Sequence, residues 1–348
     1  MPIRLKDIAK DLNLSAVTIS KVVRNQSDIS PETKKRVLER MRELNYQPNF
    51  AARTLVTGRT YSIGFVVPSL LHSFFAEIAK GIVDVIRPLG YGLLISSADE
   101  DPELERQEVD QQMARQADAL IVASSQLSGT FYRDIQSRGV PLIMVDRRFS
   151  DLRTNFIGAR DEDIGFAATE HLIERGCKVI AHLRGPDVST GLGRFHGYLK
   201  ALKRYGLRPA PELVVQVSKG DTDAEESGCS AMREILKRGL PFDGLFCYND
   251  PVAVGAMETA LNAGLRIPDD LAVVGCGNAR WARALRIPLS SVDQGSTEIG
   301  TRAAKLALKL INSRNVAKQK TILLPASVVA RASTQINRAM DVSTSRAQ

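Results

Sequence analysis

The segment Ser15–Lys21, close to the N-terminus, combines hydroxyl, small apolar and basic side chains. Ser15 is suited to cap a helix that begins at Ala16, because its hydroxyl can accept a hydrogen bond from a backbone N–H of the first turn. The outward residues of such a helix can contact base edges in the major groove of double-stranded DNA. Lys21 can donate to guanine or phosphate, whereas alanine and valine side chains can contact thymine methyl groups. The candidate DNA contacts of this segment are Ser15, Ala16, Val17, Thr18, Ser20 and Lys21.

Three short helical patterns would position these side chains. Apolar residues spaced by three and four predict a first helix over residues 5–12, and a second follows from Ala16 to about Arg24. Ser30 and Pro31 predict the start of a third helix, which continues to about Asn45. Two short helices around a tight turn and a third that closes the core form a helix-turn-helix, although a three-helix protein-interaction module would share this layout. The predicted core consists of Leu5, Ile8, Ala9, Leu12, Ile19, Val22, Val23, Val37, Leu38, Met41 and Leu44.

Charge is distributed unevenly along the 348-residue chain. Residues 1–60 contain 12 Lys and Arg against 6 Asp and Glu, a net charge of +6. The whole chain contains 47 against 39, or +8, so the other 288 residues carry only +2. This asymmetry indicates a polyanionic partner for the N-terminal segment. The alternative is a solvated basic face that has no partner.

Composition excludes several classes of protein. No apolar run approaches the roughly 18 residues of a membrane-spanning helix, and the first residues lack the apolar stretch of a signal peptide. The 4 cysteines are too few and too scattered for a disulfide framework or a metal knuckle. We expect a cytoplasmic, nucleoid-associated protein with no membrane partner, no metal site and no cofactor.

From Ser62 onward, apolar runs of strand length alternate with helical segments. Such strands, separated by helices of ten or more residues, are typical of parallel sheets covered on both faces. Two series in tandem predict two doubly wound α/β lobes with a cleft between them, lined by the loops at the carboxyl ends of the strands. The predicted strands are Ile63–Val67, Gly92–Ser96, Ala119–Ala123 and Pro141–Val145 in the first series, and Lys178–Leu183, Leu213–Val217, Gly244–Tyr248 and Leu271–Gly275 in the second.

Residues 3–58 resemble the DNA-binding headpiece of the lac repressor/purine repressor family of bacterial regulators. The matching segments are Leu5–Ala9, Val17–Val23, Leu44–Asn49 and Ala52–Leu55. The last of these resembles the family's hinge helix, which orders on operator binding. The resemblance implies that Leu55 inserts into the minor groove as an apolar wedge that bends the duplex. The DNA contacts implied for this segment are Asn49, Ala52, Arg53 and Leu55.

The resemblance continues from Ser62 to about residue 334 and includes Asn249–Met257 and Ile267–Gly275. It implies a helix-turn-helix domain at 1–47, a hinge helix and linker at 48–60, and a core of two periplasmic-binding-protein-like lobes at 61–338. In this family the lobes bind a small-molecule effector and form the interface of a homodimer. Residues 339–348 are expected to be a polar tail.

Six positions of the core match residues that contact the effector in the family. For several of them the sequence leaves an alternative open. The two phenylalanines could be a core pair at the start of a helix, Asp146 could pair with Arg147 or Arg148, and the arginine could form a surface salt bridge. Asp250 is expected to cap the following helix rather than to bind a ligand. The candidate effector contacts are Phe74, Phe75, Asp146, Arg194, Asn249 and Gln294.

The chain departs from the family pattern at two cleft positions. Gly277 stands where an aspartate usually holds the effector, and Val188 replaces an arginine of the purine repressor branch. Arg147, Arg184 and Arg194 are expected nearby, so an anionic effector, such as a sugar acid or a sugar phosphate, is one hypothesis.

Enzymatic and transport functions are disfavoured. No P-loop, GxSxG or HExxH motif is present, and Gly191–His196 lacks the last glycine of a dinucleotide fingerprint. A solute-binding protein would share the lobes, but the basic headpiece argues against it. The sequence therefore predicts a transcriptional regulator, expected to be a repressor, that binds a near-palindromic operator as a homodimer under the control of a sugar or sugar derivative.

Overall fold

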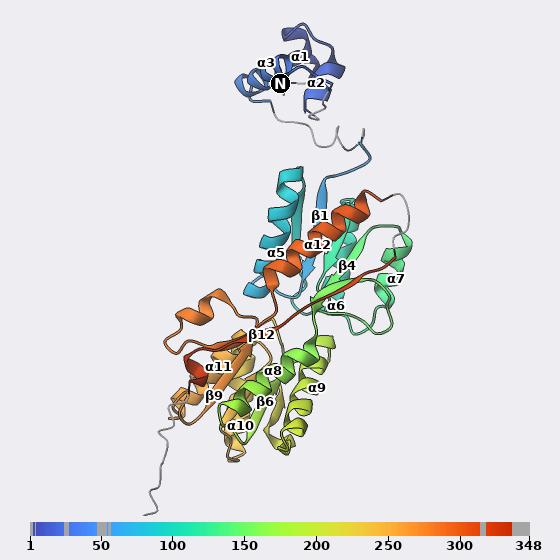
Figure 1. The fold of residues 1–348 in the computed structure, drawn as a ribbon. Helices are drawn as coiled ribbons and strands as arrows, with labels where there is room; N and C mark the ends of the chain where they lie inside the picture. The colour runs from blue at the N-terminus through green and yellow to red at the C-terminus, as the bar shows by residue number, and fades with distance from the viewer. Residues whose placement is uncertain are drawn as a thin grey trace, which may run out of the picture. The chain divides into compact units, whose positions relative to one another are not determined.

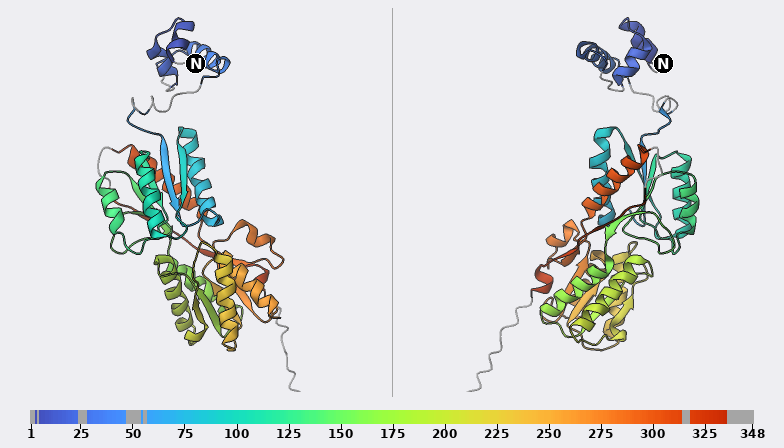
Figure 2. Two further views of the ribbon diagram at one scale, coloured as in Figure 1. Left: turned by 180° about the vertical axis from the view of Figure 1, so that it is seen from behind. Right: turned by 45° about the vertical axis from the view of Figure 1, so that its right-hand side comes forward.

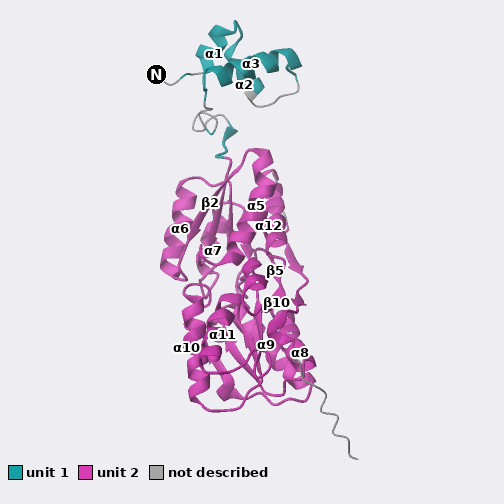
Figure 3. Ribbon diagram, turned by 90° about the vertical axis from the view of Figure 1, so that its left-hand side faces the viewer, with its two compact units in different colours: residues 1–60 teal, residues 61–348 magenta. Residues whose placement is uncertain are grey.

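The computed structural model describes residues 3, 5–23, 28–46, 54, 57–313 and 318–335. The chain divides into two compact units, residues 1–60 and 61–348, which Figure 3 shows in different colours. The predicted tail at 339–348 and most of the predicted hinge at 48–60 lie outside the described residues.

The first unit contains α1 (Leu5–Asp11), α2 (Ala16–Val23) and α3 (Pro31–Glu43), labelled in Figure 1. Serine side chains cap the second and third helices, as predicted. Ser15 Oγ accepts a hydrogen bond from the Thr18 backbone N–H at 3.0 Å, and Ser30 Oγ accepts one from the Thr33 N–H at 3.2 Å. Each cap satisfies a donor of the first turn that has no partner within the helix.

The core of the first unit matches the predicted one with one exception. Ile8, Ile19 and Val37 are fully buried, and the partly buried leucines of the unit pack around them. The prediction was wrong for Leu38, which is 37% exposed. Successive residues of a helix point about 100° apart, so the residue that follows the central Val37 turns away from the core. The side chain of Val23 lies outside the described residues.

The second unit contains two six-stranded sheets, one in each lobe. The first lobe is built on the order β11-β5-β4-β3-β1-β2 and the second on β12-β10-β9-β8-β6-β7. All pairs are parallel except β10 with β12, which are antiparallel. The strands of the first lobe are β1 (Ser62–Val67), β2 (Gly92–Ser97), β3 (Ala119–Val122), β4 (Leu142–Val145), β5 (Asn155–Ala159) and β11 (Thr321–Leu324). Those of the second are β6 (Ile180–Arg184), β7 (Val214–Gln216), β8 (Gly244–Cys247), β9 (Ala272–Cys276), β10 (Ser290–Asp293) and β12 (Ser327–Val329).

Helices cover both faces of each sheet. In the first lobe, α5 (Ser73–Ile86) and α12 (Ser296–Ile311) lie side by side on one face, and α6 (Pro102–Ala114) and α7 (Thr130–Ser137) cover the other, as Figure 2 shows. In the second lobe, α8 (Asp161–Glu174) packs with α9 (Ser189–Arg204) on one face. The opposite face carries α10 (Ala224–Lys237) and α11 (Asp250–Asn262). Each sheet therefore has a buried core on both sides, as its apolar strands require.

The chain passes between the lobes three times, and these crossings were not predicted. It enters the second lobe after β5, returns to the first at α12 and β11, and leaves again for β12. All eight predicted strands are present, whereas β5, β10, β11 and β12 were not among them. The tandem order read from the sequence is thus corrected, because apolar strands of three to five residues do not reveal which sheet they join.

Acid should destabilise the second lobe through a buried histidine. His182 is fully buried, and its ring stacks on Phe246 with 4.6 Å between the ring centroids. Burial lowers the pKa of His182 to about 3, below the ~6.5 of an unfolded chain. The contribution of His182 to the free energy of unfolding is therefore fully present above pH ~6.5. It falls by up to about 1.4 kcal/mol per pH unit as the pH decreases from there to the folded pKa. His182→Phe keeps a stacked ring but cannot take up a proton. The decrease in the free energy of unfolding from pH 7 to pH 5, measured by urea unfolding, should therefore be smaller in this variant than in the unmodified protein.

The exposed His196 provides a matched control, since His196→Phe adds the same ring in the same lobe. It should leave the pH dependence of the unfolding free energy as in the unmodified protein. Equal pH dependence in the unmodified protein and the His182 variant would show that this ring does not limit acid stability.

Candidate effector site and nucleic-acid interface

The exposed side of α2 carries the predicted DNA contacts. Ser15, Ala16 and Val17 are exposed, with Val17 at 63%, and Ile19 faces inward at 0%. Thr18, Ser20 and Lys21 are partly buried. The exposed side of this helix therefore presents small and apolar side chains, with one cation in its last turn, and groups of these kinds can contact base edges in a major groove.

Lys21 is paired with Asp28, which lies in the segment between α2 and α3. The lysine side chain is 35% exposed and the aspartate 52%, so water screens the pair and it contributes little to stability. The Lys21 side-chain hydrogen bond lowers the pKa of Asp28, which keeps the carboxylate charged. A contact of Lys21 with a base or a phosphate would therefore compete with this partner. The candidates of the hinge segment, Asn49, Ala52, Arg53 and Leu55, lie outside the described residues.

All six candidate effector residues line one pocket of the cleft between the two lobes. They come from the start of α5, the end of β4, α9, the end of β8 and the end of β10. The carboxyl ends of parallel strands meet at one edge of a sheet, so the loops that follow them converge. The cavity that these side chains leave is only about 10 Å³, far below the ~300–1,000 Å³ typical of small-molecule pockets. A ligand can therefore enter only when the lobes or the side chains move.

Arg194 is the central donor of this pocket and is 3% exposed. Its guanidinium donates to the Tyr248 backbone oxygen at 2.7 Å, to Gln294 Oε1 at 3.2 Å and to Asp161 Oδ1 at 3.3 Å. It also lies over the Tyr248 ring, 4.7 Å from the ring centroid. The alternative of a surface salt bridge does not hold, because the pair of Arg194 with Asp161 is buried. The planar fork of donors is held in one orientation by partners on three sides.

Two buried carboxyl groups flank this arginine. Asp146 Oδ1 lies 4.0 Å from an Arg194 terminal nitrogen, the one cation within that distance in the described part of the chain. Burial raises the pKa of Asp146, and burial raises that of Asp161 to about 7 against the opposing effect of Arg194. The Asp146 backbone has a left-handed φ of 62°, a conformation that costs free energy in a non-glycine residue and occurs often at functional sites. Asp146 is therefore held where its carboxyl group faces the pocket.

The aromatic residues serve both the core and the pocket. Phe74 is 6% exposed and Phe75 2% exposed, and both belong to the apolar core of the first lobe while lining the cleft. His72 caps their helix by accepting a hydrogen bond from the Phe74 backbone N–H at 3.3 Å. The two readings of the sequence, core pair and ligand contact, are thus compatible.

The helix cap that was expected of Asp250 is made by Asn249, which also lines the pocket. Asn249 caps α11 by accepting a hydrogen bond from the Val252 N–H at 3.0 Å, and its amide nitrogen donates to the Gly220 backbone oxygen. Asp250 instead accepts from the Ala279 N–H at 2.7 Å and from Ser291 Oγ at 2.6 Å. It therefore fixes the loop after β9, where Gly277, with a φ of 126°, has no side chain to do so.

The cleft carries more carboxylates than the sequence indicated. Arg147 is paired with Asp221 and Glu100, Arg184 with Asp187, and Arg194 with Asp161 and Asp146. No arginine of this group is left with an unbalanced charge. The hypothesis of an anionic effector, which relied on these three arginines, is therefore not supported by the charges of the site.

Sequence reasoning missed several residues of the cleft. Asp221 lies in the loop after β7, and Tyr248 directly follows β8. The rule that loops at carboxyl strand ends line the cleft would have included both residues. His72, Tyr248, Asp221, Cys276 and Gly277 complete the lining of the pocket.

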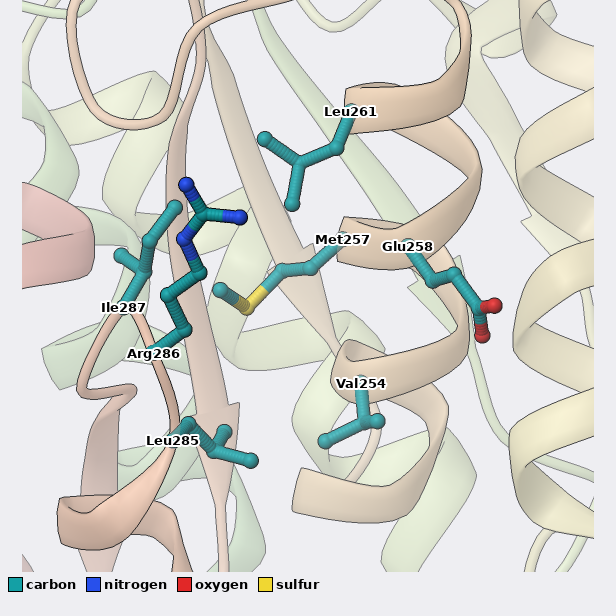
Figure 4. A pocket seen from close by; sticks show the side chains of 7 residues that line it. All are labelled: Val254, Met257, Glu258, Leu261, Leu285, Arg286 and Ile287. Carbon is teal, nitrogen blue, oxygen red and sulfur yellow. The ribbon is translucent and has the colours of Figure 1, made fainter.

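A second surface feature lies on the second lobe, between α11 and the segment 285–287. Figure 4 shows Met257 pointing from α11 towards that segment, with Val254 and Leu261 along the same side. Leu285 and Ile287 line the opposite side, so the floor and walls of this groove are apolar. Two exposed charged residues, Glu258 and Arg286, border it.

No group of three or more His, Cys, Asp or Glu in the described ranges is arranged to hold a metal ion. The described helices also include none that is long and apolar enough to cross a membrane.

Comparisons with known proteins identify both units. A family model described as "Bacterial regulatory proteins, lacI family" matches residues 4–49, and a "Periplasmic binding protein-like domain" matches residues 169–334. The HTH-type transcriptional regulator DegA of Bacillus subtilis is 30% identical over 341 residues, covering 97% of this chain and 100% of that protein. The HTH-type transcriptional repressor PurR of Klebsiella pneumoniae is 31% identical over 316 residues, covering 89% and 91%.

Among solved structures, the lac repressor dimer bound to operator and the anti-inducer ONPF is similar over both units. The TM-score is 0.82 at 27% identity, and the match covers 96% of this chain and 99% of that one. These relatives are named as regulators rather than as enzymes. The chain belongs to the LacI family of bacterial regulatory proteins and is a DNA-binding transcriptional regulator.

Proposed function

We propose that this regulator is a homodimeric repressor whose two headpieces bind a near-palindromic operator, and whose cleft binds a neutral, hydroxyl-rich effector such as a sugar. The observation that carries the proposal is the convergence of six family-matched side chains on one buried pocket, in a chain that also carries a helix-turn-helix. A regulator of this kind acts at the chromosome and hence in the cytoplasm.

The chemistry of the pocket supports a neutral effector. Asp146 and Gln294 offer oxygens that accept hydrogen bonds from hydroxyl groups, while Phe74 and Phe75 provide apolar surface for a ring face. A further anion would meet the carboxylates of Asp146 and Asp221 in a buried setting, where like charges are costly. We therefore assign the effector contacts to Phe74, Phe75, Asp146, Arg194, Asn249 and Gln294.

The groove beside α11 supports a dimer of this chain. In a two-fold symmetric dimer the same surface patch of both copies forms the interface. A residue on one side of the patch then contacts a residue on the other side of the patch in the partner, and the reverse contact also forms. Glu258 and Arg286 lie at the border of one apolar groove and carry opposite charges. A two-fold pairing can therefore bring each glutamate to the arginine of the other copy while the apolar walls are buried between them.

Selection of bound fragments from genomic DNA tests the DNA-binding half of the proposal. We expect enriched sites with two inverted half-sites whose centres lie one helical turn, about 10 base pairs, or a multiple of it apart. Genes beside these sites then indicate which metabolites to assay. Enrichment of single, unpaired half-sites would contradict binding as a dimer.

Replacing Lys21 with alanine should weaken binding to the selected operator more than binding to random DNA. A base contact of this kind contributes about 1–3 kcal/mol of discrimination, and a dimer loses it twice. Titrations of both DNAs at one stated salt concentration measure the difference, because phosphate contacts make affinity steeply salt-dependent. Equal losses on both DNAs would make Lys21 a phosphate contact.

The partner residue provides the matched variant. Asp28→Asn frees Lys21 from its ion pair and removes a negative charge. It should raise the affinity for random DNA, whereas Lys21→Ala should not.

A further inference from the structure

A carboxylate of the first lobe is bound by backbone amides of the second. Glu100 lies between β2 and α6, and its carboxylate accepts hydrogen bonds from the N–H groups of Gly220, Asp221 and Thr222, at 3.1, 3.0 and 2.9 Å. Successive amides that point at one anion form a nest, and hydrogen bonds to an ionised acceptor are about twice as strong as neutral ones. The Glu100 side chain is 9% exposed, so the contact is largely shielded from water.

Arg147 joins the same contact from the first lobe. Its guanidinium is paired with Asp221 of the second lobe, lies 3.4 Å from Glu100 and donates to the Ser124 backbone oxygen at 3.1 Å. The Arg147 side chain is 3% exposed and that of Asp221 6%. Removing one member of such a buried set leaves the opposite charge without compensation. The arrangement therefore favours the closed position of the two lobes more strongly than a surface pair could.

The loop that carries Glu100 adopts an unfavourable backbone conformation. Asp99 and Glu100 both have left-handed φ values, 50° and 56°, which non-glycine residues rarely adopt. Ser97 Oγ donates to the Asp99 carboxylate at 2.7 Å, and Asp101 caps α6 immediately afterwards. This loop is thus held on both sides of Glu100 in a form that directs the carboxylate to the other lobe.

We infer that Glu100, Arg147 and the Gly220–Thr222 loop form an interlobe clasp that stabilises the closed cleft through protein contacts alone. Each contact of the clasp joins groups of this chain, so its strength does not depend on a ligand. The small pocket beside it, about 10 Å³, admits a ligand only after the clasp opens. The apparent affinity for an effector is then reduced by the fraction of molecules in which the clasp is closed. Only this last consequence relies on the proposed effector site.

The clasp is tested on the full chain without added small molecules, by hydrogen exchange and small-angle X-ray scattering. In Glu100→Ala, exchange of the Gly220, Asp221 and Thr222 amides should accelerate at least about tenfold. The Arg148 amide, which donates to Ser189 Oγ across the cleft at 3.0 Å, should also exchange faster. The radius of gyration should rise as the lobes separate. Glu100→Gln, which keeps the side-chain volume, should give intermediate values.

Glu103→Ala is the control, since Glu103 lies three residues further along, in α6, and its side chain is 68% exposed. It should change none of these quantities. Faster exchange at the loop alone, with Arg148 and the radius of gyration unchanged, would reduce the contact to a local loop anchor and overturn the clasp. Unchanged exchange in both Glu100 variants would overturn it as well. Neither readout involves an effector, so failure to identify one would leave this result standing.

Discussion

Arg194→Met should lower the free energy of unfolding by about 3–5 kcal/mol, the usual cost of removing one partner from a buried ion pair. The variant leaves Asp161 and Asp146 without their cation and removes the donors to the Tyr248 backbone oxygen and Gln294. Methionine fills most of the space, so the loss is mainly electrostatic. Urea unfolding followed by circular dichroism measures it.

The loss should depend on pH in a defined direction. Without Arg194, the pKa values of Asp146 and Asp161, already raised by burial, rise further above the ~3.9 of an unfolded chain. Groups with raised folded pKa values favour the folded state below pH ~4 and lose that contribution as the pH rises through the folded values. The deficit relative to the unmodified protein should therefore be smallest at pH 4, where mainly the lost hydrogen bonds to Tyr248 and Gln294 contribute. It should grow as the pH rises through the folded pKa values, and the Asp161 share should appear above pH ~7.

Two further variants separate this explanation from general loss of packing. Arg194→Met combined with Asp161→Asn should recover part of the stability at pH 8, because one uncompensated charge is removed. Arg233→Met, in an exposed pair with Glu226, should cost no more than about 1 kcal/mol. A deficit that is the same at pH 4 and pH 8 would contradict the electrostatic account.

Val254→Asp should dissociate the proposed dimer and reduce operator affinity at least ~100-fold. One substitution introduces two carboxylates into the shared apolar groove, one from each copy, and buried unpaired charges cost several kcal/mol. A monomer binds only one half-site, so the contribution of the second headpiece is lost. Sedimentation velocity at micromolar concentration and operator titration measure the two effects.

The control for this variant is Leu240→Asp, which places the same charge on an apolar residue that is 40% exposed and lies outside the groove. It should remain dimeric and bind the operator as the unmodified protein does. If Val254→Asp is also dimeric while it retains its circular dichroism spectrum, the homodimer uses another surface.

Local structure could be predicted from the sequence where neighbours along the chain decide it. The caps at Ser15 and Ser30 and the buried stripe of Ile8, Ile19 and Val37 follow from spacing alone. Leu38 was misplaced because a helix rotates enough within one residue to turn a side chain from core to solvent.

The location of the cleft residues could also be predicted, but not their partners. Asp146 was placed in the cleft because it follows a parallel strand, and Arg194 and Gln294 because they match cleft positions of the family that the sequence resembles. That Arg194 is neutralised by Asp161, from a helix more than thirty residues earlier, depends on how α8 packs against α9. The charge of the cleft was misjudged for this reason.

The amino-acid sequence by itself determined the helix-turn-helix, eight of the twelve described strands and the family, because these depend on periodicity, caps and short motifs. The tertiary structure alone decided which strands share a sheet, which carboxylate compensates each arginine and that Glu100 reaches across the cleft. Such contacts join residues far apart in the chain, as Glu100 and Thr222 are. Their free energies depend on burial and distance, which no local pattern encodes.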